Sequence, residues 1–156
     1  MIRQKKSSGF TLTEMLVYMG IFSIILVIIT QMFVSILQAK LDTQSTSSVE
    51  QDSRFLVQRF IYDLQRATAI TSPASGQSNS LTLTINGQPY TYQLTGTNLL
   101  VNSAIRLNSH DTGIQNLVFS RAGNAVSIGG TVFSQIIKSS GPEVRNIITT
   151  INLRSH

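Results

Sequence analysis

Residues 15–37 read MLVYMGIFSIILVIITQMFVSIL, and this stretch decides the fold. It holds no Asp, Glu, Lys or Arg, and Gln31 is its only strongly polar side chain. As an α-helix the stretch rises about 34 Å, which is enough to cross a hydrocarbon layer of about 30 Å. A bilayer offers no partners to free backbone groups, so a membrane-spanning helix is the expected conformation.

Outside this stretch the chain is polar but carries few charges. The full sequence of 156 residues is 42% hydrophobic and only 12% charged, about half of the usual charged share. This composition excludes a charge-rich disordered chain. The sequence contains no cysteine, which excludes disulfides, thiol catalysis and cysteine-based zinc sites.

The net charge of +5 is concentrated at the N-terminus. Arg3, Lys5 and Lys6 supply three of the positive charges, so residues 10–156 carry nine basic and seven acidic side chains, a net of +2. That charge is too small and too scattered for a nucleic-acid-binding surface. A basic cluster followed by an apolar helix predicts that the N-terminus stays in the cytoplasm.

A distinctive motif joins the basic cluster to the apolar stretch, KKSSGFTLTEML from Lys5 to Leu16. It resembles the processing signal of type IV pilins and pseudopilins, in which a basic leader, Gly, Phe, three residues, Glu and an apolar helix follow one another. The resemblance implies that a membrane-embedded prepilin peptidase cuts between Gly9 and Phe10 and methylates the new amino group of Phe10. It also implies that Glu14 is the carboxylate used in filament assembly.

An acid at the head of an apolar helix needs a physical reason, because a carboxylate at mid-bilayer costs roughly 2.5–3.5 kcal/mol on insertion scales. Cleavage before Phe10 would create an amine one helical turn from Glu14 and on nearly the same face. In a packed bundle of such helices, Glu14 could pair with the amine of a neighbour and set the axial register, since either charge left alone is costly. The simpler alternative is that Glu14 only reaches the lipid headgroups.

The chain departs from the family pattern at two points that do not affect the cleavage position. Thr13 stands where the family usually has an aliphatic residue, and the leader, residues 1–9, is short. Two other details bear on the subtype. No proline precedes Pro73, whereas many major pilins carry one in the apolar helix, and this favours a minor pilin or a pseudopilin. The stretch DLQRA at residues 63–67 is similar to the same region of J-type minor pseudopilins and the related minor pilins.

Residues 38–70 contain no glycine or proline, and their pattern predicts an amphipathic continuation of the helix. Positions facing one side recur every three or four residues, namely Val49, Ser53, Leu56, Phe60, Leu64 and Ala67. Together with the apolar stretch, this pattern predicts one helix over residues 10–70, roughly 90 Å long. Ser72-Pro73 is expected to end it and to begin a loop.

After the proline the hydrophobic period changes to two, which predicts strands. Residues 81–85 and 90–94 alternate in this way, and Asn86-Gly87 between them is a hairpin signal. Further strands are expected at residues 99–101, 105–107, 117–119, 126–128 and 147–153.

The predicted fold is therefore α+β. A long N-terminal helix, with a membrane half and an amphipathic half, packs on a C-terminal antiparallel sheet as in pilins. The predicted parts are a cytoplasmic leader at residues 1–9, a transmembrane and assembly helix at 10–37, the amphipathic continuation at 38–71 and the sheet domain at 72–156.

The C-terminal part offers little catalytic chemistry. His110 and Asp111 are neighbours in a polar loop, and no serine lies in a nucleophile-elbow context beside them. Asp111 with Asn108 and Ser109 is a thin pattern for a calcium loop. Gly129-Gly130 lacks the lysine of a phosphate-binding loop. The sequence predicts no enzyme, no cofactor and no metal site.

The resemblance implies a structural subunit, a minor pilin or pseudopilin, of a type IV pilus, a type II secretion filament or a competence filament. The expected partners are prepilin peptidase, other pilin or pseudopilin subunits, the inner-membrane assembly platform and the lipid bilayer, without direct binding of nucleic acid. The expected location is the inner membrane, as a single-pass protein with its C-terminal domain outside the cytoplasm, and then an envelope filament. The alternative is an uncleaved anchor that displays a ligand-binding β domain, and a membrane-tethered hydrolase has less support.

Overall fold

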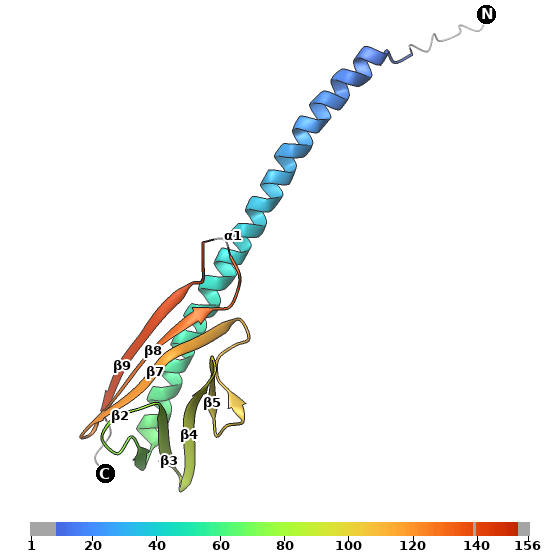
Figure 1. Ribbon diagram of the computed structural model, residues 1–156. Coiled ribbons are helices and arrows are strands. Elements are labelled where there is room, and N and C mark those ends of the chain that lie inside the picture. The colour runs from blue at the N-terminus through green and yellow to red at the C-terminus, as the bar shows by residue number, and fades with distance from the viewer. Residues whose placement is uncertain (1–8, 139, 153–156) are drawn as a thin grey trace, which may run out of the picture. The chain divides into compact units, whose positions relative to one another are not determined.

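The computed structural model describes residues 9–138 and 140–152 (Figure 1). A single long helix, α1, runs from Leu12 to Arg66, and the described residues after it form nine strands. The chain divides into two compact units, residues 1–40 and residues 41–156. Each unit is described by itself.

In the first unit α1 carries the apolar stretch, and its large apolar side chains are exposed. An 18-residue window within α1 has a mean hydropathy of 2.5, and none of that window is buried. Among the described residues, α1 is the one helix long and apolar enough to cross a membrane. The hydroxyls of Ser23, Thr30 and Ser35 each donate to the carbonyl four residues earlier, at 2.8–3.0 Å. These polar groups are thus satisfied inside the helix, as a hydrocarbon environment requires.

The helix ends at Arg66 and not at residue 70, so the predicted helix end was wrong. The backbone N–H of Thr68 donates to the carbonyl of Thr84 at 2.8 Å, and strand β1 (Ala69–Ser72) follows directly. This short segment is rich in β-branched residues, which favour strands. Its backbone pairs with strand β3 in place of continuing the helical ladder.

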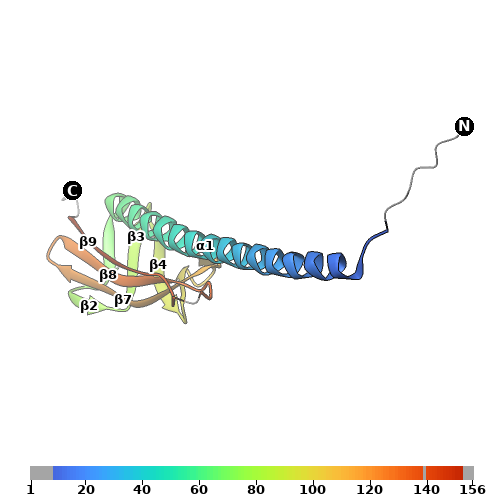
Figure 2. The same cartoon turned by 90° about the horizontal axis from the view of Figure 1, so that it is seen from above.

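The strands form two antiparallel sheets where the sequence predicted one (Figures 1 and 2). The five-stranded sheet has the order β1-β3-β4-β5-β6, with β3 Ser80–Ile85, β4 Gln88–Thr95, β5 Asn98–Val101 and β6 Ile105–Arg106. The four-stranded sheet has the order β2-β7-β8-β9, with β2 Gly76–Ser78, β7 Thr112–Ala122, β8 Ala125–Ser134 and β9 Val144–Asn152. The predicted class, a long helix packed on antiparallel sheet in an α+β fold, is confirmed.

The short strand β2 carries the chain from the first sheet to the second. The chain leaves the first sheet after β1, pairs with β7 through β2, and then returns to the first sheet with β3. The sequence of β2 is Gly-Gln-Ser, which shows no apolar alternation. The sequence therefore predicted only a loop here, and the division of the strands into two sheets was missed.

The β3–β4 hairpin forms at Asn86-Gly87, as predicted. Both residues have positive φ angles, 52° and 75°, and this conformation is typical of the two-residue hairpin turn that asparagine and glycine favour.

The core of the second unit lies between the later part of α1 and the sheets, which Figure 2 shows gathered against it. The predicted helical stripe is confirmed, since Val49, Leu56, Phe60 and Leu64 are almost fully buried. The strands contribute the alternating inward residues, Leu81, Leu83, Tyr92, Leu99, Ile114, Phe119, Val126, Ile128 and Val132.

Gly130 on β8 has a packing role. The pairing of β7 with β8 is interrupted by a register shift between Gln115 and Val118. A Cβ at Gly130 would lie 3.0 Å from Cδ1 of Leu117, so the glycine leaves room for the irregular strand opposite it. This packing accounts for Gly130, whereas a Cβ at Gly129 would meet nothing within 4 Å.

A buried polar cluster joins α1 to β4. Asp63, which is 2% exposed, accepts a hydrogen bond from Nε of Arg59 at 2.7 Å and another from the hydroxyl of Tyr92. The Tyr92 ring also packs on Phe60, with ring centroids 5.2 Å apart. Burial, and then the hydrogen bond to Asp63, raises the pKa of Tyr92 above its ordinary value of 10.0.

The raised pKa of Tyr92 predicts that the folded protein loses stability at alkaline pH. In the unfolded chain its hydroxyl titrates near pH 10, whereas the folded protein holds the proton to higher pH. The stabilisation that the Tyr92 hydroxyl contributes is complete below about pH 10. Above that pH it falls by at most about 1.4 kcal/mol per pH unit. Thermal unfolding of the detergent-solubilised protein across this pH range should therefore show a shallower decline for Tyr92→Phe than for the wild type. Tyr62→Phe alters an exposed tyrosine and should follow the wild type; equal slopes for Tyr92→Phe and the wild type would contradict the assignment.

Candidate functional site

The predicted processing position lies just before α1. Gly9 and Phe10 precede the helix and are exposed. A Cβ at Gly9 would meet nothing within 4 Å, so the packing of the chain itself does not require glycine there. The predicted leader charges Arg3, Lys5 and Lys6 lie outside the described residues.

Thr11 caps the start of α1. Its Oγ1 accepts a hydrogen bond from the backbone N–H of Glu14 at 3.3 Å, and its carbonyl accepts one from the N–H of Met15 at 3.2 Å. Thr-x-x-Glu is the spacing of a capping box. Thr11 was not among the predicted site residues, although this spacing is visible in the sequence. The cap fixes where the helix begins and so holds Glu14 in its first turn.

The Glu14 carboxylate lies on one face with two aromatic rings. The hydroxyl of Tyr18 donates to Oε1 of Glu14 at 3.4 Å, one turn farther along the helix. The ring of Phe10 packs against the ring of Tyr18, with centroids 5.7 Å apart. Glu14 is exposed, and it takes part in no ion pair found among the described residues. Its position in the first turn favours a negative charge, because the helix dipole is positive at that end.

Hydrogen bonds hold the polar loop that contains His110 and Asp111 to the rest of the second unit. Oδ1 of Asn108 accepts a hydrogen bond from the N–H of Leu99 at 3.0 Å. Oδ2 of Asp111 accepts one from Nε2 of Gln44 on α1 at 3.3 Å. These oxygens belong to the predicted calcium-loop pattern, and in the structure they accept hydrogen bonds from Leu99 and Gln44. Within residues 9–138 and 140–152, no group of three His, Cys, Asp or Glu side chains is placed to hold a metal ion.

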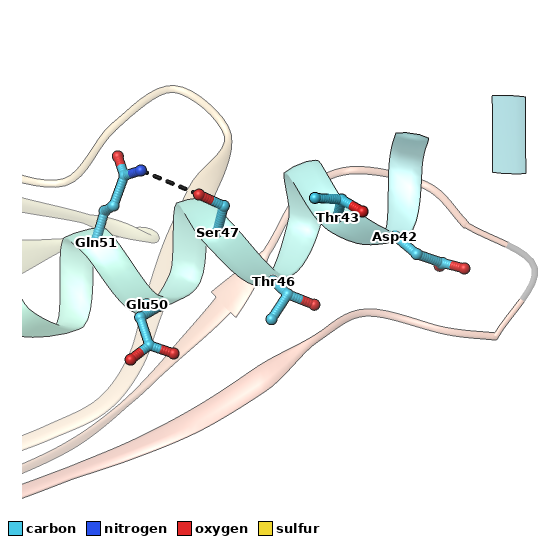
Figure 3. Close-up of a pocket in the computed structure, with 6 residues that line it drawn as sticks. All are labelled: Asp42, Thr43, Thr46, Ser47, Glu50 and Gln51. Carbon is cyan, nitrogen blue, oxygen red and sulfur yellow. Dashed lines mark hydrogen bonds between the residues drawn. The ribbon is translucent and has the colours of Figure 1, made fainter. Parts of the chain in front are cut away.

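A hollow of about 490 Å³ lies along α1 (Figure 3) and is lined by Asp42, Thr43, Thr46, Ser47, Glu50 and Gln51. Nε2 of Gln51 donates to Oγ of Ser47 at 3.0 Å (Figure 3). Glu50 is paired with Arg54 at 2.6 Å and with Arg145 at 2.9 Å. The hydrogen bond from Arg54, and then that from Arg145, holds the pKa of Glu50 below its ordinary value. Glu50 therefore joins α1 to β9 as an ionised, paired carboxylate.

The N-terminal segment matches a known protein family, the Prokaryotic N-terminal methylation motif, over residues 4–30. The matched range includes Gly9, Phe10, Glu14 and much of the apolar stretch. No curated protein and no solved structure matches the chain. The motif covers the segment where processing was predicted, and the rest of the chain folds as a helix packed on antiparallel sheets. Taken together, these two observations show that the chain carries a prokaryotic N-terminal methylation motif and has a pilin-like α+β fold.

Proposed function

We propose that the protein is a minor pilin or pseudopilin, a structural subunit of a type IV pilus, a type II secretion filament or a competence filament. The observation that carries the proposal is the order of features at the head of α1. An open Gly9–Phe10 step is followed by a capped first turn that holds Glu14, and then by an apolar helix. The family motif over the same residues supports it. In this role the protein is not an enzyme and needs no cofactor.

Processing comes first in the proposed sequence of events. The precursor lies in the inner membrane with residues 1–9 in the cytoplasm and the sheet domain outside. Prepilin peptidase hydrolyses the amide between Gly9 and Phe10, which adds water across that bond and releases the amino group of Phe10. A sulfonium methyl donor bound by the peptidase then transfers its methyl group to the new amine, which releases a proton, and the donor leaves as a thioether.

Assembly follows from the chemistry of the new N-terminus. The amine of Phe10 and the carboxylate of Glu14 have opposite charges, and Tyr18 is the one side chain seen bonded to that carboxylate in the described part of the chain. When the assembly platform moves the subunit from lipid into the filament, the exposed apolar side chains of α1 exchange lipid for neighbouring helices. In this low-dielectric setting Glu14 pairs with the amine of a neighbouring subunit, and the pairing fixes the axial register.

The intact mass of the protein from cells with an active prepilin peptidase tests the proposal. We expect a chain that begins at Phe10 and carries one additional methyl group. A chain that still contains residues 1–9 would contradict the proposal and would leave an uncleaved anchor with a ligand-binding β domain.

A valine at Gly9 should block this processing. The side chain meets open space in the protein itself, so the fold should be unchanged and the block would reflect recognition by the peptidase. Gly20→Val is the matched control, because a Cβ at Gly20 also meets nothing within 4 Å. It should be cleaved as the wild type is, and normal cleavage of Gly9→Val would refute the predicted cleavage position.

A further inference from the structure

Gln31 places a carboxamide inside the apolar stretch. It lies six residues before Leu37, the last residue of that stretch, and six helical residues rise about 9 Å. When residues 15–37 span the hydrocarbon, a glutamine side chain at this depth is too short to reach the headgroup layer. The donors and the acceptor of the carboxamide therefore lie among the lipid chains.

Within the part of the chain that the structure describes, the Gln31 carboxamide has no hydrogen-bond partner. The backbone carbonyl of Gln31 accepts a hydrogen bond from the hydroxyl of Ser35 at 3.0 Å, but the side chain is exposed and makes no bond of its own. Ser23 and Thr30 differ, because their hydroxyls are satisfied inside α1. An amide without a partner is costly in hydrocarbon, so the Gln31 side chain favours a neighbouring helix that offers one.

The face of α1 that carries Gln31 has residues spaced alternately by three and four positions. This is the heptad spacing of two helices that pack along their length. Within the apolar stretch this face, here named the glutamine seam, consists of Val17, Gly20, Ile24, Val27, Gln31 and Val34. The bulkier Phe22 and Phe33 lie nine residues before and two residues after Gln31, on the opposite side of the helix.

Gly20 suits this seam to a close contact. A Cβ at Gly20 would meet nothing within 4 Å, so packing within the chain does not require glycine there. In membranes, a glycine at a helix–helix interface lets the two backbones approach closely. Two helices can therefore come nearest to each other along the glutamine seam, where the unpartnered carboxamide also lies.

We propose that the glutamine seam binds the same seam of a second copy of the chain, with the two Gln31 carboxamides hydrogen-bonded across the interface. A carboxamide both donates and accepts, so two of them can bond reciprocally about a two-fold axis. A second copy holds its carboxamide at the required depth, because the basic cluster gives every copy the same orientation in the bilayer. The inference goes beyond the proposed function and requires only that the apolar stretch lies in the membrane.

The pair belongs to the membrane and not to the filament. In the proposed filament, Glu14 of one subunit pairs with the Phe10 amine of another, which staggers the two helices by four residues, about 6 Å. Two Gln31 side chains staggered in this way no longer lie opposite each other. This consequence rests on the proposed function, and it makes the pair a store of subunits that assembly must separate.

Sedimentation equilibrium of the full chain in detergent micelles measures the pairing. We expect a monomer–dimer equilibrium for the wild type and about tenfold weaker association for Gln31→Leu. Gln31→Asn keeps a carboxamide and should restore part of the association. Thr30→Val is the matched control, because it removes a neighbouring polar group that is already satisfied within α1. It should associate as the wild type does. A monomeric wild type, or a Gln31→Leu protein that associates as tightly as the wild type, would overturn the inference.

The absence of cysteine allows the paired face to be identified directly. The full chain would be reconstituted in vesicles of phosphatidylethanolamine and phosphatidylglycerol and oxidised with copper phenanthroline. Ile24→Cys, on the glutamine seam, should form a disulfide-linked dimer. Phe22→Cys, on the opposite face, should remain mostly reduced. Equal crosslinking at the two positions would indicate random collision and would count against the seam.

Intact mass separates the pairing from the proposed function. A chain that is cleaved and methylated but stays monomeric would overturn the pairing alone. A dimeric chain that retains residues 1–9 would contradict the proposed function and would support the pairing.

Discussion

Replacing Glu14 with alanine should leave the removal of residues 1–9 intact and should exclude the protein from assembled filaments. The cleavage position lies before the helix, and Thr11 caps the helix through the backbone N–H of residue 14. Neither the cleavage position nor the cap therefore depends on the carboxylate. In the filament, however, the amine of a neighbouring subunit would lose its partner. Removing one member of a buried ion pair costs about 3–5 kcal/mol, which corresponds to at least a hundredfold loss in association.

The measurement compares the sheared filament fraction with the membrane fraction, and intact mass establishes processing. Tyr18→Phe is the matched control, since among the described residues it removes the one hydroxyl bonded to the Glu14 carboxylate, and it keeps the ring that packs on Phe10. It should enter filaments as the wild type does. Incorporation of the Glu14→Ala protein at the wild-type level would refute the role proposed for this carboxylate.

Asp63→Ala should cause a large loss of stability in the second unit. It would leave the Tyr92 hydroxyl without its acceptor in the core and Arg59 without its counter-ion. The expected cost is about 3–5 kcal/mol, a large part of the roughly 5–15 kcal/mol that stabilises a typical domain. We expect the melting temperature to fall by roughly 10–20 °C.

Thermal unfolding monitored by circular dichroism would check this result. Asp63→Asn keeps the shape and one acceptor oxygen, so its melting temperature should lie between those of the wild type and Asp63→Ala. Glu50→Ala removes a partly exposed carboxylate that also has two arginine partners, and it should have only a small effect because water screens these ion pairs. Similar melting temperatures for Asp63→Ala and Glu50→Ala would show that the buried cluster does not hold α1 to β4.

The helix and the fold class could be predicted because their signals lie in continuous segments of sequence. The apolar stretch is recognisable by its length and its lack of charge. The stripe from Val49 to Leu64 repeats at the helical spacing, and β3 and β4 alternate on either side of Asn86-Gly87. The second sheet could not be predicted, since β2 has no apolar alternation and its pairing with β7 joins residues far apart in the sequence. Strands β7 and β8 are longer than predicted. The register shift after Gln115 breaks the apolar alternation from which strands are predicted.

The predicted site was readable for a different reason: its residues are adjacent in the sequence. Gly9, Phe10 and Glu14 form a local pattern, and the family motif covers the same residues. Their roles in cleavage, methylation and assembly remain predictions. The contacts that hold the second unit together are long-range, such as Lys138 with Asp42 and Asp63 with Tyr92. No local sequence pattern indicates such pairs, because only folding brings the two partners together.

The hydroxyls of Ser23, Thr30 and Ser35 have a mechanical consequence. Each donates to a carbonyl of its own helix, so apart from Gln31 the middle of the apolar segment offers a neighbour only dispersion contacts, which lack direction. We expect a subunit to rotate about its long axis with little resistance once its end is held. A fibre built from such subunits would take up torsion by small rotations of its helices, while the Glu14 pairs keep each subunit at its axial position.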